Sequence, residues 1–191
     1  MKCMICESWS FSHICVTCQN NLLTPRLHKR KILGNIPVYS FYPYDEIESL
    51  LLTKHTDIGY YIYTILAKRS LGTFAQTWEY GYRVASIGID DDPKSGYSHT
   101  AVLNRALRSP AITPRYGKLR AQNHHKYAGK SVEERLMNPR GFLCSPFNEE
   151  EVILVDDIVT TGLTLSEAAE ALHAQGKKVI LCLTLTDAEN K

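Results

Sequence analysis

The sequence predicts an α/β fold in which a mostly parallel sheet is flanked by helices and preceded by a small cysteine-rich module. Short apolar, β-branched runs alternate along the chain with segments whose apolar residues recur at helical spacing. The run at residues 152–155 contains no polar residue, which is typical of a parallel strand covered on both faces. Four of the six cysteines lie within residues 1–18, so this segment differs in composition from the rest.

The first element is the cysteine module, residues 1–23, which contains two Cys-x-x-Cys pairs. The four cysteines are Cys3, Cys6, Cys15 and Cys18. Two such pairs can place four thiolates in a tetrahedron around one ion, so we expect a structural Zn²⁺ site. Disulfides are an alternative, but no apolar signal segment precedes the pairs. A redox motif is another, but it would be a single pair after a strand. Cys144 and Cys182 stand alone in apolar surroundings and are expected to be buried thiols.

Residues 24–35 form a polar, basic segment, which we expect to link the module to the main domain at residues 36–191. Pro25 and the charge run that follows it favour a connector without its own core. The same cations could contact nucleic acid, and the sequence leaves the solvated connector and the nucleic-acid contact equally open.

The main domain is expected to begin with a strand at residues 38–44 and to alternate between helices and strands. Ser98 is a suitable helix N-cap, and Ser131 with Glu134 forms a capping box. The other expected helices are at residues 47–52, 58–71, 98–107 and 131–137, and the other expected strands are at residues 84–89, 111–115, 141–145, 152–155 and 179–185.

Residues 152–164, Val-Ile-Leu-Val-Asp-Asp-Ile-Val-Thr-Thr-Gly-Leu-Thr, carry the clearest chemistry. Asp156 and Asp157 follow the buried strand, at the sheet edge where open α/β folds bind ligands. The turn into a helix at residues 165–174 contains Thr160, Thr161, Gly162 and Thr164. Helix N-termini bind phosphates, and carboxylates accept from sugar hydroxyls, so this pattern suits a phosphorylated ribose. An ordinary strand–turn–helix is the alternative. A Walker B strand would need a partner loop that the sequence lacks.

This stretch resembles the phosphoribosyl pyrophosphate (PRPP) signature of type I phosphoribosyltransferases. The resemblance implies that Asp156 and Asp157 face the ribose hydroxyls, directly or through Mg²⁺, and that residues 160–164 hold the 5-phosphate. Together with the four-cysteine module, the chain resembles the ComF family of competence-associated phosphoribosyltransferase-like proteins. Three further segments look like family landmarks: Leu51-Leu52-Thr53-Lys54, Lys118-Leu119-Arg120-Ala121-Gln122, and residues 133–142.

The chain departs from that family at the loop after the second strand of the main domain. Family members carry Arg-Gly-Phe-Asn-Gln there, and this chain has Ser95-Gly96-Tyr97-Ser98-His99 with Lys94 before it. The resemblance implies that Lys94, Ser95 and Gly96 bind the pyrophosphate of PRPP. Lysine is a point charge without the bidentate fork of arginine, and residues 90–92 are acids that would repel a phosphate unless Mg²⁺ bridges them. A plain surface turn is the alternative.

The resemblance implies a protein of natural transformation that binds PRPP and single-stranded DNA and helps DNA uptake into the cytoplasm. An active phosphoribosyltransferase acting on a base or amine is the alternative, and a sensor of PRPP or nucleotides is a third reading. His124 and His125 are acid–base candidates, but adjacent histidines on a basic loop are commonly exposed bystanders. Tyr116 and Tyr127 could stack on bases. The expected DNA contacts are Arg26, Lys29, Arg30, Lys31, Lys118, Arg120 and Lys126.

The net charge of +2 is too small to indicate a partner by itself. No run of 18 apolar residues is present, so no membrane span is expected. With no signal segment, we expect a cytoplasmic protein, which other competence or DNA-translocation proteins could bring to the inner face of the membrane.

Overall fold

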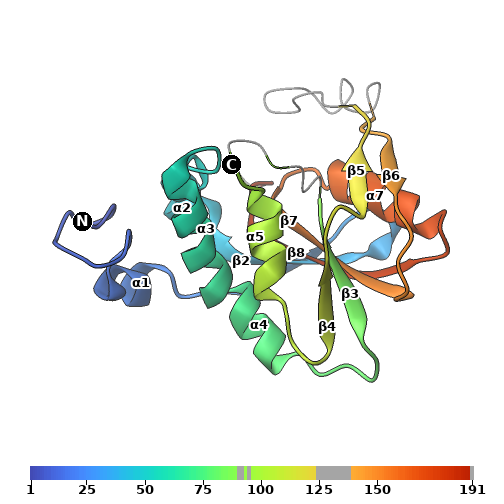
Figure 1. The fold of residues 1–191 in the computed structure, drawn as a ribbon, viewed down its shortest axis with the longest axis horizontal. Coiled ribbons are helices and arrows are strands. Elements are labelled where there is room, and N and C mark those ends of the chain that lie inside the picture. The colour runs from blue at the N-terminus through green and yellow to red at the C-terminus, as the bar shows by residue number, and fades with distance from the viewer. Residues whose placement is uncertain (90–92, 94–95, 124–138, 190–191) are drawn as a thin grey trace.

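A computed structural model describes residues 1–89, 93, 96–123 and 139–189. Its centre is a six-stranded sheet with the order β1-β2-β8-β7-β3-β4 (Figure 1). All neighbouring strands run parallel except β1 and β2, which are antiparallel. The predicted α/β class with a mostly parallel sheet is therefore confirmed. The strands are β1 (His28–Lys31), β2 (Pro37–Pro43), β3 (Val84–Gly88), β4 (Ile112–Arg115), β7 (Glu151–Val159) and β8 (Lys178–Asp187).

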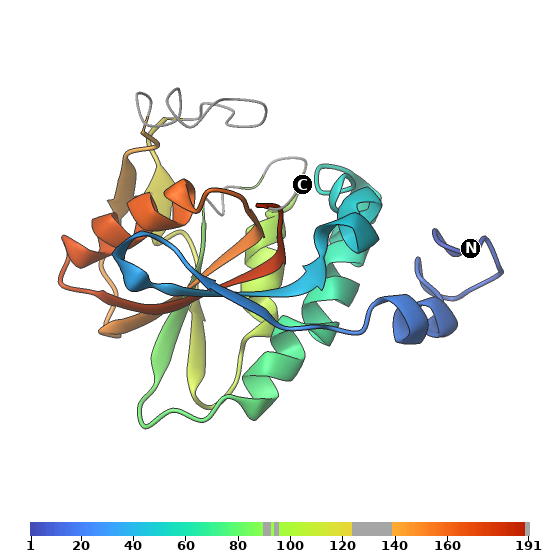
Figure 2. The same cartoon turned by 180° about the vertical axis from the view of Figure 1, so that it is seen from behind.

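Helices cover both faces of this sheet (Figures 1 and 2). One face carries α2 (Tyr44–Leu51), α3 (Asp57–Arg69), α4 (Leu71–Thr77) and α5 (His99–Ala106), and the other carries α7 (Leu163–His173). Side chains of β7 alternate between the two cores, because Ile153 and Val155 face the first group whereas Val152 and Leu154 face α7. All four are completely buried, as the uninterrupted apolar run predicts.

The strand that carries the two acids is longer than predicted. It pairs with β3 only as far as Val155, but it continues beside β8 as far as Val159. Asp156 and Asp157 therefore lie within β7, just past the end of its pairing with β3. One side of the strand is open at this level, so side chains from the helices can reach the acids.

Other expected elements also differ from the structure. The segment expected as a linker contains β1, because the backbone of residues 28–31 pairs with the edge of β2. The strand expected at residues 141–145 is β6 (Phe142–Cys144), which pairs with β5 (Leu119–Ala121) in a separate antiparallel ribbon. The helix expected through residue 71 ends at Arg69, because Ser70 adopts a non-helical backbone (φ −100°, ψ −80°) before α4 begins. The helix expected at residues 131–137 lies outside the described residues.

The cysteine module lies against α3. It contains α1 (Val16–Leu22), and its fully buried Ile14 and Leu23 belong to the same apolar cluster as α3. Arg69 Nε donates to the carbonyl of Leu23 at 2.9 Å, and the ring of His13 stacks on that of Tyr61 with centroids 4.5 Å apart. A short 3₁₀ helix, η1 (Leu33–Asn35), connects β1 to β2. Over the described residues, no helix has the length and apolar character needed to cross a membrane.

Candidate sugar-phosphate site and cysteine cluster

The four cysteines of the N-terminal module converge on one point. Their Sγ atoms all lie within 4.8 Å of one another, and none of them forms a disulfide. The Cys6 and Cys15 sulfurs are 3.7 Å apart. A tetrahedral zinc site with Zn–S bonds of about 2.3 Å has sulfurs about 3.8 Å apart, so the cluster has the size that a metal requires.

Backbone N–H groups support these sulfurs. Cys15 N donates to the Cys3 sulfur at 3.3 Å, and Cys18 N donates to the Cys15 sulfur at 3.4 Å. Burial opposes ionisation of Cys3, but the surrounding N–H donors hold its pKa down, at about 6. Burial and the neighbouring thiols raise the pKa of Cys18 to about 12. Four thiolates this close need a compensating cation, so the donor set fits a thiophilic divalent metal.

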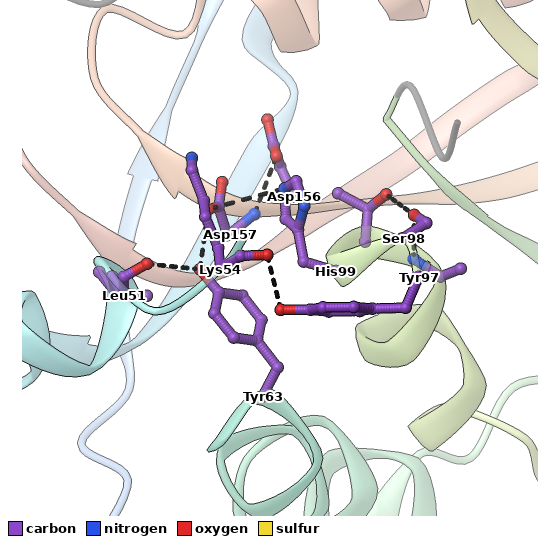
Figure 3. Close-up of polar contacts among 10 residues, drawn as sticks. Leu51, Lys54, Tyr63, Tyr97, Ser98, His99, Asp156 and Asp157 are labelled. Atoms are coloured by element: carbon purple, nitrogen blue, oxygen red, sulfur yellow. Dashed lines mark hydrogen bonds and ion pairs between the residues drawn. The ribbon is translucent and has the colours of Figure 1, made fainter. Parts of the chain in front are cut away.

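The two adjacent acids of β7 differ in burial and in their partners. Asp157 is buried on the α3–α5 side of the sheet, whereas Asp156 is half-buried at the open edge of the strand (Figure 3). The Asp157 N–H donates to Asp156 Oδ1 at 2.8 Å, which orients the outer carboxylate. The sequence predicts that both acids face one ligand; the environments of the two differ, and an oxygen of each carboxylate lies within 4.8 Å of the other.

The Asp157 carboxylate is the centre of a buried polar network. Its Oδ2 accepts from Lys54 Nζ at 3.2 Å and from the Tyr63 hydroxyl at 3.1 Å, and it lies 3.8 Å from His99 Nε2. Lys54 follows α2, Tyr63 lies on α3 and His99 opens α5, so three elements meet at this oxygen (Figure 3). Burial favours the neutral acid, but His99 and Lys54 hold the pKa of Asp157 below its usual value.

Close packing gives this network its shape. The Tyr97 hydroxyl donates to the Lys54 carbonyl at 2.6 Å and fixes the end of the α2 segment. A Cβ on Gly59 would lie 2.0 Å from the Thr53 carbonyl oxygen and 2.3 Å from the Tyr97 hydroxyl. Only glycine lets α3 start this close to the lysine-bearing turn. The predicted N-cap is confirmed, because the Ser98 hydroxyl accepts from Ala101 N at 3.1 Å.

Asp156 has the opposite electrostatic environment. Burial and the neighbouring Asp157 raise the pKa of Asp156 to about 8, with Lys54 and Arg140 acting against this rise. Its carboxylate oxygen, one from Asp157 and the His99 nitrogen lie within 4.8 Å of one another. A carboxyl group whose pKa lies near neutral pH, at an open edge of the sheet, can accept hydrogen bonds from hydroxyl groups or bind a hydrated cation.

The turn after β7 leads into α7 through a glycine. Gly162 is the N-cap of α7 in the left-handed region (φ 80°) and has no side chain to cap the helix, and Thr161 Oγ1 accepts from Leu163 N at a long distance of 3.5 Å. A Cβ on Gly162 would lie 2.4 Å from Cγ2 of Ile32, so the turn packs directly on the chain after β1. The helix has eleven residues and begins at Leu163, two positions earlier than predicted. Thr160 and Thr164 are half-buried in this segment, and Thr161 is exposed.

Arg30 holds this turn from the neighbouring edge of the sheet. Its guanidinium donates to the Thr160 carbonyl and to the Asp187 carboxylate, and it also pairs with Glu189 at 3.3 Å. We expected Arg30 to contact DNA, but its side chain is largely buried in contacts within the protein. The sequence could not reveal this role, because Arg30 and Asp187 are 157 positions apart.

Some of the other expected site residues lie outside the described part of the chain, and the rest are either exposed or paired within the protein. Lys94 and Ser95, the acids at residues 90–92, and His124, His125, Lys126 and Tyr127 lie outside the described residues. Gly96 is exposed with φ 85°. Among the expected DNA contacts, Lys29, Lys31 and Arg120 are exposed, whereas Arg26 pairs with Glu46 and Lys118 donates to the Pro146 carbonyl at 2.7 Å. Cys182 is buried as predicted, and Cys144 is half-buried.

The geometry defines an α/β protein with carboxylates and a helix N-terminus at the carboxyl edge of a parallel sheet. A family model described as "Phosphoribosyl transferase domain" matches residues 119–191, which include this edge. The fold is therefore phosphoribosyltransferase-like. No curated protein matches the chain.

Among solved structures, a hypoxanthine phosphoribosyltransferase from Staphylococcus aureus is 16% identical with a TM-score of 0.43. The match covers 67% of this chain and 64% of that chain. An orotate phosphoribosyltransferase from Aeropyrum pernix is 17% identical with a TM-score of 0.41. That match covers 90% of this chain and 80% of the other.

Proposed function

We propose that this protein binds PRPP at the carboxyl edge of β7. The observation that carries the proposal is the half-buried Asp156 near the end of β7, close in sequence to the turn into α7 and inside the segment that the phosphoribosyl transferase family model matches. The first N–H groups of a helix have no intrahelical acceptor, and they lie at the positive end of the helix dipole. They suit the 5-phosphate, with the hydroxyls of Thr160, Thr161 and Thr164 as further donors.

In this proposal Asp156 is the acid that faces the ribose. Its carboxylate is at the open edge, whereas Asp157 already accepts from Lys54 and Tyr63. Mg²⁺ suits Asp156 because this ion binds proteins through one or two carboxylates together with substrate phosphates. Asp157 then acts by positioning the backbone of Asp156. For the pyrophosphate we retain the loop of Lys94, Ser95 and Gly96, of which only Gly96 is described.

The N-terminal module, residues 1–23, is proposed to hold one structural Zn²⁺ through Cys3, Cys6, Cys15 and Cys18. A segment of this size buries too little apolar surface to fold alone, and zinc can contribute roughly 10–16 kcal/mol to such a module. Mass spectrometry under native conditions should therefore detect one zinc per chain. The Cys15→Ala variant should lose the metal, whereas the Cys144→Ala variant should keep it. A protein that folds its module without zinc would contradict the assignment.

The finer part of the proposal is a role in natural transformation, in which the protein handles single-stranded DNA entering the cytoplasm. It rests on the resemblance to the ComF family, since a four-cysteine cluster precedes a phosphoribosyltransferase-like fold. Measuring pyrophosphate release with a panel of bases and amines tests the alternative of an active transferase.

Calorimetric titration with PRPP, with and without Mg²⁺, tests the site itself. Thr161→Val should weaken binding roughly threefold to tenfold, because it removes a hydroxyl donor and preserves the shape. Thr24→Val is the matched control, since the exposed Thr24 lies between α1 and β1 and outside the turn and α7. Wild-type protein that does not bind PRPP in the presence of Mg²⁺ would refute the proposal.

A further inference from the structure

A groove between α3, α4 and α5 is lined by exposed cations and by small residues. Its volume is about 430 Å³. The small lining residues are Ala67, Gly72, Ala75 and Ala106. The helices that form it lie side by side on the face seen in Figure 1, below the sugar-phosphate site. None of the sequence motifs discussed above includes these lining residues.

The charge of this groove has one sign. Its lining includes Lys68, Arg105 and Arg108 and no acid. All three cations are exposed, and none of them makes an ion pair within the part of the chain that the structure describes. Cations that are not neutralised by neighbouring acids create a local positive potential, although the net charge of the whole chain is only +2.

The groove continues into a second one on the other side of α4. The second has a volume of about 690 Å³ and shares Lys68 and Gln76 with the first. It adds Arg69 and the half-buried ring of Phe74, and its lining is also free of acids. In the first groove, the ring of Tyr60 is 38% exposed. The ring of Phe74 in the second groove packs against Phe41 and Trp78, so Tyr60 offers the more accessible ring. Because the two grooves share Lys68 and Gln76, we treat them as one surface, called the track.

This arrangement suits a single-stranded nucleic acid better than a small anion. Sites for small ligands bring several polar groups together on one point, whereas here exposed cations on α3 and at the end of α5 line a groove that also contains small apolar residues. Proteins that bind single strands without sequence preference combine a positive groove along the backbone with aromatic rings that stack on bases. Neither of these two grooves includes the exposed cations of β1, which lies on the side seen in Figure 2.

We propose that the track formed by α3, α4 and α5 is the surface that binds the backbone of a single-stranded nucleic acid. The inference rests on the DNA-handling part of the proposed function and places it on residues other than those expected from the sequence. Lys68, Arg105 and Arg108 contact phosphates, and Tyr60 stacks on a base.

The proposal also predicts a connection to the sugar-phosphate site. α3 carries Tyr60 and Lys68 along the track and Tyr63 in the network of Asp157. α5 carries Arg105 in the track and His99 beside the same carboxylate. A strand in the track therefore contacts both helices that position Asp157, and its binding can alter the affinity for PRPP through these helices.

Two variants with equal loss of charge test the surface. The first is Lys68→Ala, Arg105→Ala, Arg108→Ala in the track, and the second is Lys29→Ala, Lys31→Ala, Arg120→Ala outside it. Fluorescence anisotropy with a labelled thymidine oligonucleotide of about 16 nucleotides measures affinity over a range of salt concentrations. Circular dichroism and urea unfolding check that both variants fold, which is expected because all six side chains are exposed.

The track variant should bind roughly tenfold more weakly at low salt, and its salt slope should be flatter by about 2, since each phosphate contact on a single strand contributes about 0.7. The second variant should bind within about twofold of wild type. A variant with Arg105→Lys and Arg108→Lys keeps the positive charges, so its salt slope should be close to that of wild type. Equal losses in both charge-matched variants, or an unchanged track variant, would overturn the proposal.

Two further outcomes separate the proposals. Thymidine monophosphate could compete with the oligonucleotide when its concentration only equals that of the oligonucleotide phosphates. This result would indicate a site for a small ligand and overturn the proposal that the track binds a single-stranded nucleic acid. Wild-type protein that binds PRPP but no oligonucleotide, even at low salt, would overturn both this inference and the DNA-handling role, and it would leave PRPP binding intact. Loss of PRPP binding alone would refute the sugar-phosphate site without affecting the track.

Discussion

The two sides of β7 at its carboxyl edge have the same residue type and opposite surroundings. On the inner side, Asp157 accepts from Lys54 and Tyr63 and is closed off from solvent. On the outer side, Asp156 lies at the open edge before the turn into α7. Adjacent strand residues point to opposite faces, so one carboxylate can hold the helices in place while the other remains available for a ligand. Two identical, adjacent residues therefore have different environments.

The largest effect should follow from removing the inner carboxylate. Asp157→Ala leaves the Lys54 ammonium and the Tyr63 hydroxyl without their acceptor, so the free energy of unfolding should fall by about 3 kcal/mol. Asp156→Ala should cost less than half of that, because its carboxylate is half-buried and the donors Lys54 and Tyr63 bind Asp157 instead. Urea denaturation compares the two variants, and equal losses would mean that the two sides do not differ as described.

The outer carboxylate should dominate ligand binding instead. Asp156→Asn should weaken PRPP binding by roughly tenfold to a hundredfold, because loss of a charged acceptor costs about 1.5–3 kcal/mol. Calorimetry in the presence of Mg²⁺ measures this loss. Asp45→Asn, at an exposed acid on α2, is the control and should bind as wild type does. Unchanged affinity in the Asp156 variant would place the ligand elsewhere.

The two acids should also give opposite pH dependences of stability. The pKa of Asp156 is raised to about 8, so the folded state holds a proton that the unfolded state releases near pH 4. This contribution is complete below about pH 4 and is lost as the pH rises towards 8. The pKa of Asp157 is lowered, so its contribution is present above about pH 4 and is lost as the pH falls further.

Asp156→Asn should therefore unfold less readily than wild type at pH 8, by on the order of 1 kcal/mol after allowance for partial solvent exposure. The difference should shrink towards pH 5. Urea midpoints measured at both pH values check this. The raised pKa would be contradicted if the stabilities of wild type and variant changed by the same amount between pH 5 and pH 8.

A smaller effect should come from the arginine that holds the turn. Arg30→Gln removes the ion pair with Asp187 and loosens the hold on the Thr160 carbonyl, so PRPP affinity should fall roughly threefold. Lys29→Gln is the neighbouring control, because the exposed Lys29 lies over the ring of Tyr39 and away from the turn. An Arg30 variant that binds PRPP normally would mean that the turn keeps its geometry unaided.

The sequence by itself determined the parts that depend on local patterns. The buried strand at residues 152–155, the acids after it and the turn into a helix follow each other along the chain, and the structure retains that order. The four cysteines also come together as their spacing predicts, because each Cys-x-x-Cys pair fixes two sulfurs within one turn. The predicted elements differ from the structure mainly at their ends, as for β7, whose length depends on its neighbours.

Only the tertiary structure decided which of these side chains share a site. Lys54, Tyr63 and His99 reach Asp157 from three elements that are distant in sequence, and burial selects them as its partners. In the sequence Arg30 is one cation of a basic segment, but strand pairing at the sheet edge brings it to the turn after β7, where it donates to the Thr160 carbonyl. A pattern in the sequence records local spacing, whereas pairing and packing bring together residues whose separation along the chain carries no signal.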